Sequence, residues 1–167
     1  GDVIVMPKII QLNDKSGDKV YLRSMVGLSS TITAPSQTFN TTVKTKVEFD
    51  YQSNTFSQHE QLQLYNNGIR IGNGISKVRI DTQLWSQSNT NCYTSVHITK
   101  NSTEITYDIF PPTNVSGHLW RSISAYANID VQVGDVIYIY LRHSEASANN
   151  RIDYYLNSNR LTVTVLQ

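Results

Sequence analysis

Residues 131–142 read VQVGDVIYIYLR, and this stretch decides the fold class. Gly134-Asp135 marks a turn, because glycine accepts backbone angles that other residues resist. After the turn, the side chains alternate between the two faces of an extended segment. One face holds Ile137, Ile139 and Leu141, and the other holds Val136, Tyr138 and Tyr140. This alternation predicts a β-strand with one face in a core.

The same period-two pattern continues on both sides of this stretch. We predict further strands over residues 42–50, 75–85, 92–98, 105–110, 123–131 and 160–167. In the first of them, Val43 and Phe49 are expected to face the core. Turn signals separate the strands at Gly72-Asn73-Gly74, Asn101-Ser102-Thr103 and Pro111-Pro112. About eight to ten short strands with turns at such intervals predict an all-β sandwich or barrel.

The composition is that of a β protein. Val, Ile and Thr number 46 of the 167 residues, whereas Ala, Leu and Glu number 20. β-Branched side chains are stiff at their first torsion angle and fit a pleated sheet, and strong helix formers are scarce. We therefore expect at most a turn or two of helix.

Charge and apolar runs exclude several classes of protein. The chain has 14 Lys+Arg and 13 Asp+Glu with no dense basic run, so we expect no nucleic-acid partner. No apolar run approaches the roughly 20 residues of a spanning helix, so we expect no membrane insertion. Cys92 is the single cysteine, so no internal disulfide can form.

The sequence carries no legible catalytic or metal-binding motif. His59, His97, His118 and His143 lie at no metal-ligand spacing, and no Gly-x-Ser-x-Gly motif is present. His97 lies on a predicted strand face, where a hydrogen-bonded structural role is favoured. We predict no cofactor, no metal site and no enzymatic activity. Four aspartates that could converge in space leave a small glycan hydrolase as an alternative; they are Asp50, Asp81, Asp108 and Asp130.

Two short segments are candidates for ligand binding. The first follows a Pro-rich loop and contains His118, Trp120 and Arg121. The second is the pair Tyr154 and Tyr155, in the loop before the last strand. Aromatic rings beside hydrogen-bonding groups stack on sugars or pack against a protein partner. The other interpretation is that Trp120 and one of the tyrosines close the ends of the sandwich.

Five segments, in this order, carry a resemblance to a known family. They are residues 43–50, 74–85, 97–101, 131–139 and 158–166. Together they resemble the tumour-necrosis-factor-like jelly roll, the fold of the complement globular heads. The resemblance covers residues 38–167 and implies a jelly-roll head domain of about eight to ten antiparallel strands. Residues 1–37 are then an N-terminal extended or hairpin segment.

The resemblance also implies assembly and binding. Heads of this family are typically trimers that recognise partners through outer loops and the grooves between protomers. In such a trimer we expect Tyr138 and Tyr140 at the interface, since aromatics supply a large apolar area with a polar end. The fold is also used at the tips of bacterial and phage fibres, and residues 6–21 are similar to the openings of phage and prophage structural proteins.

These observations predict a non-enzymatic homotrimeric head domain of a phage, prophage or bacterial surface protein. It would bind a cell-surface glycan or protein and lie on a virion surface, outside the cell or on the cell surface. The alternative is a monomeric carbohydrate-binding module of a secreted protein, with aromatics on one exposed face.

Overall fold

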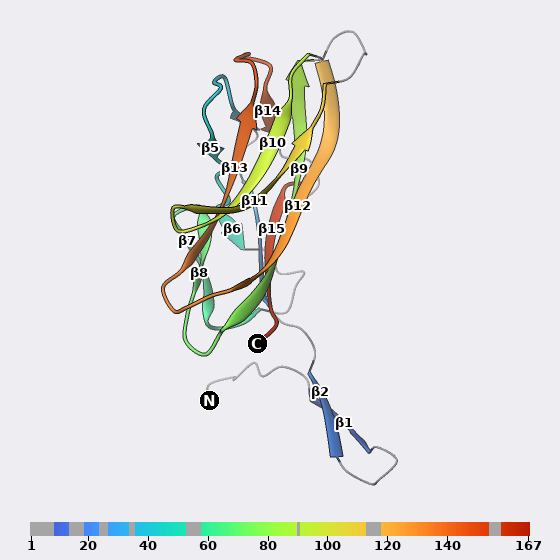
Figure 1. The fold of residues 1–167 in the computed structure, drawn as a ribbon, viewed down its shortest axis with the longest axis vertical. Coiled ribbons are helices and arrows are strands. Elements are labelled where there is room, and N and C mark those ends of the chain that lie inside the picture. Colours follow the sequence, from blue (N-terminus) through green and yellow to red (C-terminus); the bar gives the residue numbers. More distant parts are fainter. Residues whose placement is uncertain are drawn as a thin grey trace.

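The computed structural model describes residues 9–13, 19–23, 27–33, 36–52, 58–89, 91–112, 118–153 and 158–167. For residues 9–13, 19–23, 118 and 119 it describes the backbone alone. All regular structure in these ranges is β-strand, in two main antiparallel sheets packed as a sandwich (Figure 1). The prediction of an all-β fold is confirmed. Within the same ranges, no helix is long and apolar enough to cross a membrane.

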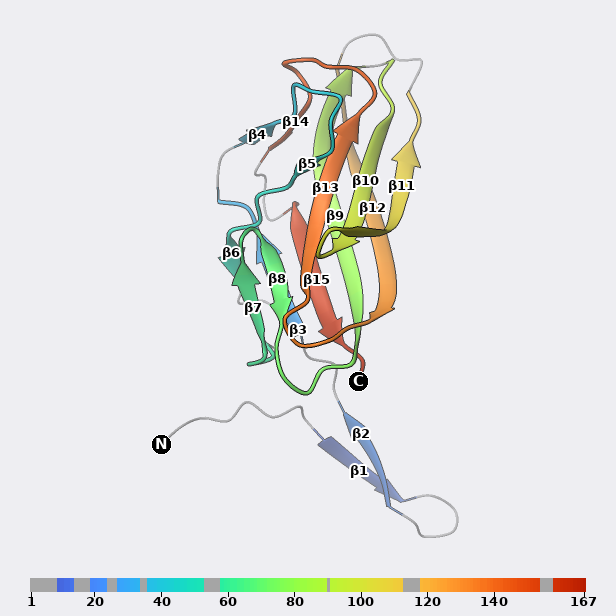
Figure 2. The ribbon, with the colours of Figure 1, turned by 60° about the vertical axis from the view of Figure 1, so that its left-hand side comes forward.

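One layer is a six-stranded sheet. Its main path runs in the order β11 (Thr103–Phe110), β10 (Thr94–Lys100), β13 (Val136–His143), β8 (Gly68–Ile71) and β7 (Leu62–Tyr65). The short strand β5 (Thr45–Lys46) also pairs with β13. β11 forms one edge, and β10 is hydrogen-bonded to a neighbour on each side (Figure 2).

The other layer is a seven-stranded sheet built around one long strand, β9 (Lys77–Asn89). Along one side of β9, β12 (His118–Asp130) pairs with it over the full length. Along the other side lie β15 (Arg160–Val165) and then β14 (Arg151–Asp153). The remaining strands are β3 (Gly27–Thr31), beside β15, followed by β6 (Tyr51–Gln52), and β4 (Ser36–Thr38), beside β14.

The core lies between the two sheets and is lined by alternate residues of the long strands. Ile137, Ile139 and Leu141 of β13 are fully buried, as the alternation in residues 131–142 predicts. The predicted strands over residues 75–85, 92–98, 123–131 and 160–167 also bury apolar positions, among them Val78, Ile80, Leu84, Val96, Ile98, Ile123, Leu161 and Val163. Gly134 has φ of 90°, so the Gly-Asp turn before β13 needs glycine at that position.

One predicted strand, residues 42–50, is wrong in its extent and in the placement of Val43, whereas Phe49 is buried in the core as predicted. Only Thr45–Lys46 pairs in a ladder, and Val43 is 67% exposed. The reason is that this segment passes from one sheet to the other. The amide of Val47 donates to Ile139 in the six-stranded sheet, and the amide of Asp50 donates to Thr31 in the seven-stranded sheet. Residues 42–50 therefore alternate between apolar and polar side chains although most of the segment lies outside a β-ladder.

The N-terminal part of the chain holds a hairpin. β1 (Ile9–Asn13) pairs antiparallel with β2 (Lys19–Arg23), and the pair lies at one end of the sandwich (Figure 2). β3 and β4 follow it in the chain and pair inside the seven-stranded sheet. The division into residues 1–37 and 38–167 stays a prediction.

Candidate binding sites on the two sheet faces

The outer face of the six-stranded sheet brings polar and aromatic residues into rows across three strands. In one row, Ser95 of β10 lies between Ile109 of β11 and Arg142 of β13. In the next row, His97 of β10 lies beside Tyr107 of β11. This order follows from the pleat, because residues two apart on a strand share a face.

These rows form the floor and one wall of an open pocket of about 460 Å³, here called the His97 pocket. The other wall is residues 42–44, the segment that the sequence predicts as a core strand. The residues that line the whole His97 pocket are Thr42, Val43, Lys44, Ser95, His97, Glu104, Tyr107, Ile109 and Arg142. The pocket thus combines cations, aromatic rings and apolar side chains.

A chain of hydrogen bonds crosses the floor of the His97 pocket. The Ser95 Oγ lies 2.7 Å from His97 Nε2, and His97 Nδ1 lies 2.5 Å from Glu104 Oε1. The same carboxylate oxygen accepts a bond from Lys44 Nζ at 3.2 Å. The His97 ring stacks on Tyr107 with 5.3 Å between ring centroids. These contacts hold the floor of the pocket in one arrangement.

Burial decides the charge of His97. Loss of hydration lowers the pKa of the imidazole, and the charges of Lys44 and Arg142 act in the same direction. The hydrogen bond from His97 to Glu104, and the negative charge of Glu104, oppose them but do not reverse the shift. The imidazole is therefore neutral at pH 7, with the Nδ1–H donating to Glu104 and Nε2 accepting from Ser95.

Glu104 remains ionised beside the neutral imidazole. Loss of hydration favours its uncharged form, but the hydrogen bonds from His97 and Lys44 outweigh that effect and lower its pKa. Its negative charge is held by two donors on two different segments of the chain. Glu104 thus links the loop at Lys44 to the sheet.

The order Ser95–His97–Glu104 matches the order of a nucleophile, base and orienting acid. Acyl transfer also needs donors that stabilise an oxyanion beside the serine. β10 lies between two strands, so its amides near Ser95 are used in the ladders to β11 and β13. This strand therefore supplies no amides for an oxyanion, and the chain of bonds is suited to positioning side chains.

The predicted interface residues Tyr138 and Tyr140 lie on this outer face too, but both are half-buried by their own chain. Lys46 Nζ lies 4.6 Å from the centre of the Tyr138 ring, and Asn66 donates to the Tyr138 hydroxyl at 3.5 Å. Tyr140 lines a second cavity of about 350 Å³ together with Val43. Their place at a trimer interface stays a prediction.

The outer face of the seven-stranded sheet carries a second group of aromatics. Trp120 of β12 stacks on Trp85 of β9 with ring centroids 6.0 Å apart. The guanidinium of Arg151 lies 5.4 Å from the Trp120 ring. The two rings form a half-exposed aromatic platform with a cation beside it, and a binding role for Trp120 stays a prediction.

Arg121 does not join Trp120 in one site, because adjacent residues of a strand face opposite ways. Its guanidinium donates to the carbonyl oxygens of Pro111 at 2.6 Å and Phe110 at 3.1 Å. Arg121 therefore ties β12 to the end of β11. The side chain of His118, and both Tyr154 and Tyr155, lie outside the described residues.

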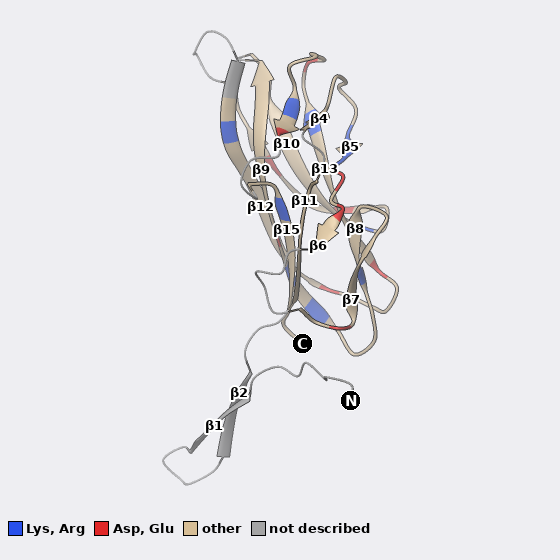
Figure 3. Ribbon diagram, turned by 180° about the vertical axis from the view of Figure 1, so that it is seen from behind, with Lys and Arg blue, Asp and Glu red and all other residues tan. Residues whose placement is uncertain are grey.

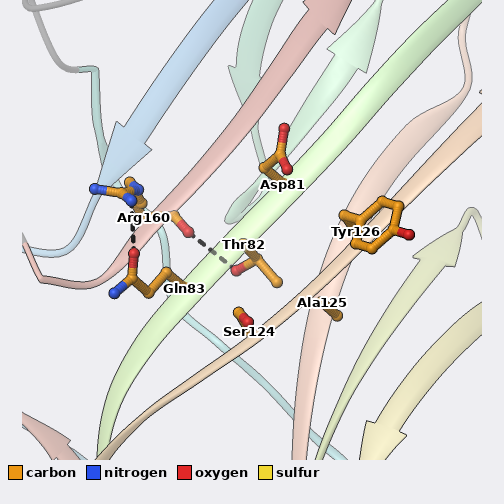
Figure 4. A pocket seen from close by; sticks show the side chains of 7 residues that line it. All are labelled: Asp81, Thr82, Gln83, Ser124, Ala125, Tyr126 and Arg160. Carbon is orange, nitrogen blue, oxygen red and sulfur yellow. Dashed lines mark hydrogen bonds between the residues drawn. The ribbon is translucent and has the colours of Figure 1, made fainter.

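A shallow pocket of about 150 Å³ lies further along the seven-stranded sheet, over β9, β12 and β15 (Figure 4). Tyr126 stands at its rim and is 64% exposed. Arg160 donates to Gln83 at 2.5 Å, and the backbone oxygen of Arg160 accepts from Thr82.

Acidic and basic residues are interspersed along the strands (Figure 3).

The sites that sequence reasoning missed are the His97 pocket and the Trp85–Trp120 stack. Of the predicted ligand-binding residues whose side chains the structure describes, Trp120 is stacked on another aromatic at an outer face, and Arg121 is not. Within the described ranges, no group of three or more His, Cys, Asp or Glu side chains could hold a metal ion. Asp81, one possible acid of a hydrolase pair, is bound to Arg79 at 3.0 Å.

Comparison with known proteins identifies the fold. No protein-family model matches the sequence, and no curated protein matches it. Among solved structures, murine APRIL at pH 5.0 and at pH 8.5 each superposes with a TM-score of 0.61 and 12% identity. Each match covers 86% of this chain and 100% of the APRIL chain. The described sandwich is a tumour-necrosis-factor-like jelly roll, as the sequence predicts.

Proposed function

We propose that this protein is a non-enzymatic head domain that forms a homotrimer and binds a cell-surface glycan or protein. The observation that carries the proposal is a tumour-necrosis-factor-like jelly roll with exposed aromatics on both outer sheet faces. Heads with this fold are typically trimers, and exposed aromatic side chains suit both an interface and a binding site. Three sites on one rigid trimer would multiply a weak affinity.

Two surfaces compete for the trimer interface. Tyr126, on the outer face of β12, is 64% exposed, more than any other described aromatic side chain, so it has a large apolar surface left to bury. Tyr138 and Tyr140, the residues that the sequence predicts, are already half-covered. We therefore propose that the β12 face contributes to the interface.

Light scattering on a sizing column tests the assembly. We expect a mass near three times 18.9 kDa for the natural sequence. Tyr126→Glu should give a monomer, because the interface would remove the hydration of a carboxylate whose cationic neighbour, Arg79, is already paired with Asp81. If Tyr140→Glu dissociates the trimer and Tyr126→Glu does not, the interface lies at β13 instead. A monomeric natural protein would contradict the trimer altogether.

The proposed setting is a phage or prophage structural protein or a bacterial surface protein, on a virion or cell surface. It is supported by the similarity of residues 6–21 to phage and prophage openings. Labelling of intact virions and intact cells with an antibody against this domain tests the setting. Signal only after lysis would contradict it.

The second candidate is a monomeric carbohydrate-binding module, which the Trp85–Trp120 platform favours. A monomer that loses glycan binding on Trp120→Ala would support this candidate over the trimer. Shortening of a labelled polysaccharide in the same assay would contradict both, because it would show hydrolysis.

A further inference from the structure

We infer that the His97 pocket binds an N-acetylated acidic sugar, through Arg142 for the carboxylate and Tyr107, Ile109 and Val43 for the ring and the acetyl group. This inference rests on the proposed glycan-binding function and names its ligand class and its site.

Charge indicates an anionic ligand. Lys44 is paired with Glu104 at 3.2 Å, so these two charges offset each other. The Nε–H of Arg142 donates to a backbone carbonyl, that of Thr42, at 2.9 Å. Among the described residues no carboxylate pairs with Arg142, and beyond that bond a guanidinium has four further N–H groups. A planar carboxylate matches this fork in a bidentate contact.

The apolar part of the pocket indicates a sugar with a methyl-bearing substituent. Val43, Ile109 and Tyr107 are 67%, 54% and 50% exposed, and all three line the same pocket as Arg142. An inorganic anion could pair with Arg142 but has no apolar surface to cover these three exposed side chains. A sugar ring can stack on the Tyr107 face, and an acetyl methyl can contact Ile109 and Val43.

The floor of the pocket is held in place before any ligand arrives. Tyr107 is stacked on His97, and His97 is bonded to Ser95 and Glu104. The carbonyl of Thr42 orients the guanidinium of Arg142. Fixing the binding groups in advance reduces the entropy lost on association.

Titration calorimetry with the whole protein and three monosaccharide glycosides tests the inference. The probes are the methyl glycosides of N-acetylneuraminic acid, glucuronic acid and N-acetylglucosamine. We expect the first to bind most tightly, because it has both the carboxylate and the acetyl group. Equal binding of all three would overturn the inference.

Three variants separate the site from general surface charge. Arg142→Gln should weaken binding of the N-acetylneuraminic acid glycoside about tenfold or more, and Tyr107→Ala about fivefold, by loss of a charged contact and of a stacking surface. Arg70→Gln is the matched control: it removes one positive charge from the same sheet, where Arg70 bonds to Gln63. It should change binding less than about twofold. Unfolding midpoints within a few degrees would show that all three variants fold.

The two proposals fail in different ways. Binding that is unchanged in Arg142→Gln overturns the pocket assignment, even if the trimer binds other glycans. Binding lost in Arg142→Gln by a protein that is a monomer supports the pocket and overturns the trimer. Binding of a sulfated glycosaminoglycan with no binding of the N-acetylneuraminic acid glycoside would also overturn the inference.

Discussion

The His143 side chain is buried on the inner face of β13, where its ring lies 6.0 Å from that of Phe39. Among the described residues neither ring nitrogen has a hydrogen-bond partner. Burial lowers the pKa of His143 to about 4, and the charge of Arg121 adds to the shift. The folded protein therefore holds a neutral imidazole at pH values where the unfolded chain binds a proton.

This arrangement predicts that the free energy of unfolding falls as the pH drops from about 6.5 to about 4. The unfolded state takes up a proton first, so acid favours it, and the loss attributable to His143 is about 3 kcal/mol. His143→Phe should remove that part of the pH dependence in urea unfolding series. His97, whose pKa is also lowered, should leave a pH dependence of the same sign in the His143→Phe variant. An unchanged slope would contradict the assignment to His143.

For His97, the sequence predicts the face of the strand on which the side chain lies but not the residue to which it bonds. Alternation correctly predicts that His97 faces away from the core and that Ile98 faces into it. Its bond to Glu104 depends on a register shift in the β10–β11 ladder between Ile98 and Thr99. Because a bulge is set by tertiary pairing, the sequence gives no sign of that contact.

At the scale of elements, the pairing of β3 with β15 depends on the absence of a side chain at Gly27. A Cβ at Gly27 would lie 1.9 Å from the backbone oxygen of Val163. Gly27 also accepts a hydrogen bond from the amide of His59 at 2.7 Å. The glycine allows three segments to approach closely at one point of the sheet.

Gly27→Ala should therefore lower the free energy of unfolding by about 3 kcal/mol, the upper range for overpacking. Ser29→Ala, in the same strand, is the control. It removes a bond to Thr162 and should lower stability by about 1 kcal/mol. Chemical denaturation of both variants gives the comparison. A glycine variant no less stable than the serine variant would show that β15 can move aside.

Sequence patterning works for some elements and not for others. Residues 75–85 and 123–131 were predictable because long strands with one buried face show clear alternation. The hairpin between β7 and β8 was missed, although Asn67-Gly68 is a turn signal, because its two strands are short and adjoin a polar segment. The turn lies at Asn66 and Asn67, with φ of 48° and 65°, angles that asparagine tolerates.

At the scale of the whole molecule, the two sheets share one core and are joined at one edge by Arg121, which links β12 to the end of β11. The sequence predicts the sandwich because nearly every long strand has one apolar face. It could not predict the His97 pocket, whose walls come from segments more than 50 residues apart. Such a site exists only after the strands have paired.

β9 is hydrogen-bonded along both sides, to β12 over its full length and to β15 and β14 on the other side. Local fraying exposes the amides of edge strands, but it cannot free those in the middle of β9 without opening the whole sheet. Deuterium uptake by peptides from residues 80–86 should therefore be the slowest in the protein. Its rate would measure global stability without any denaturant, and uptake as fast as that of β11 would show that the sheet opens in parts.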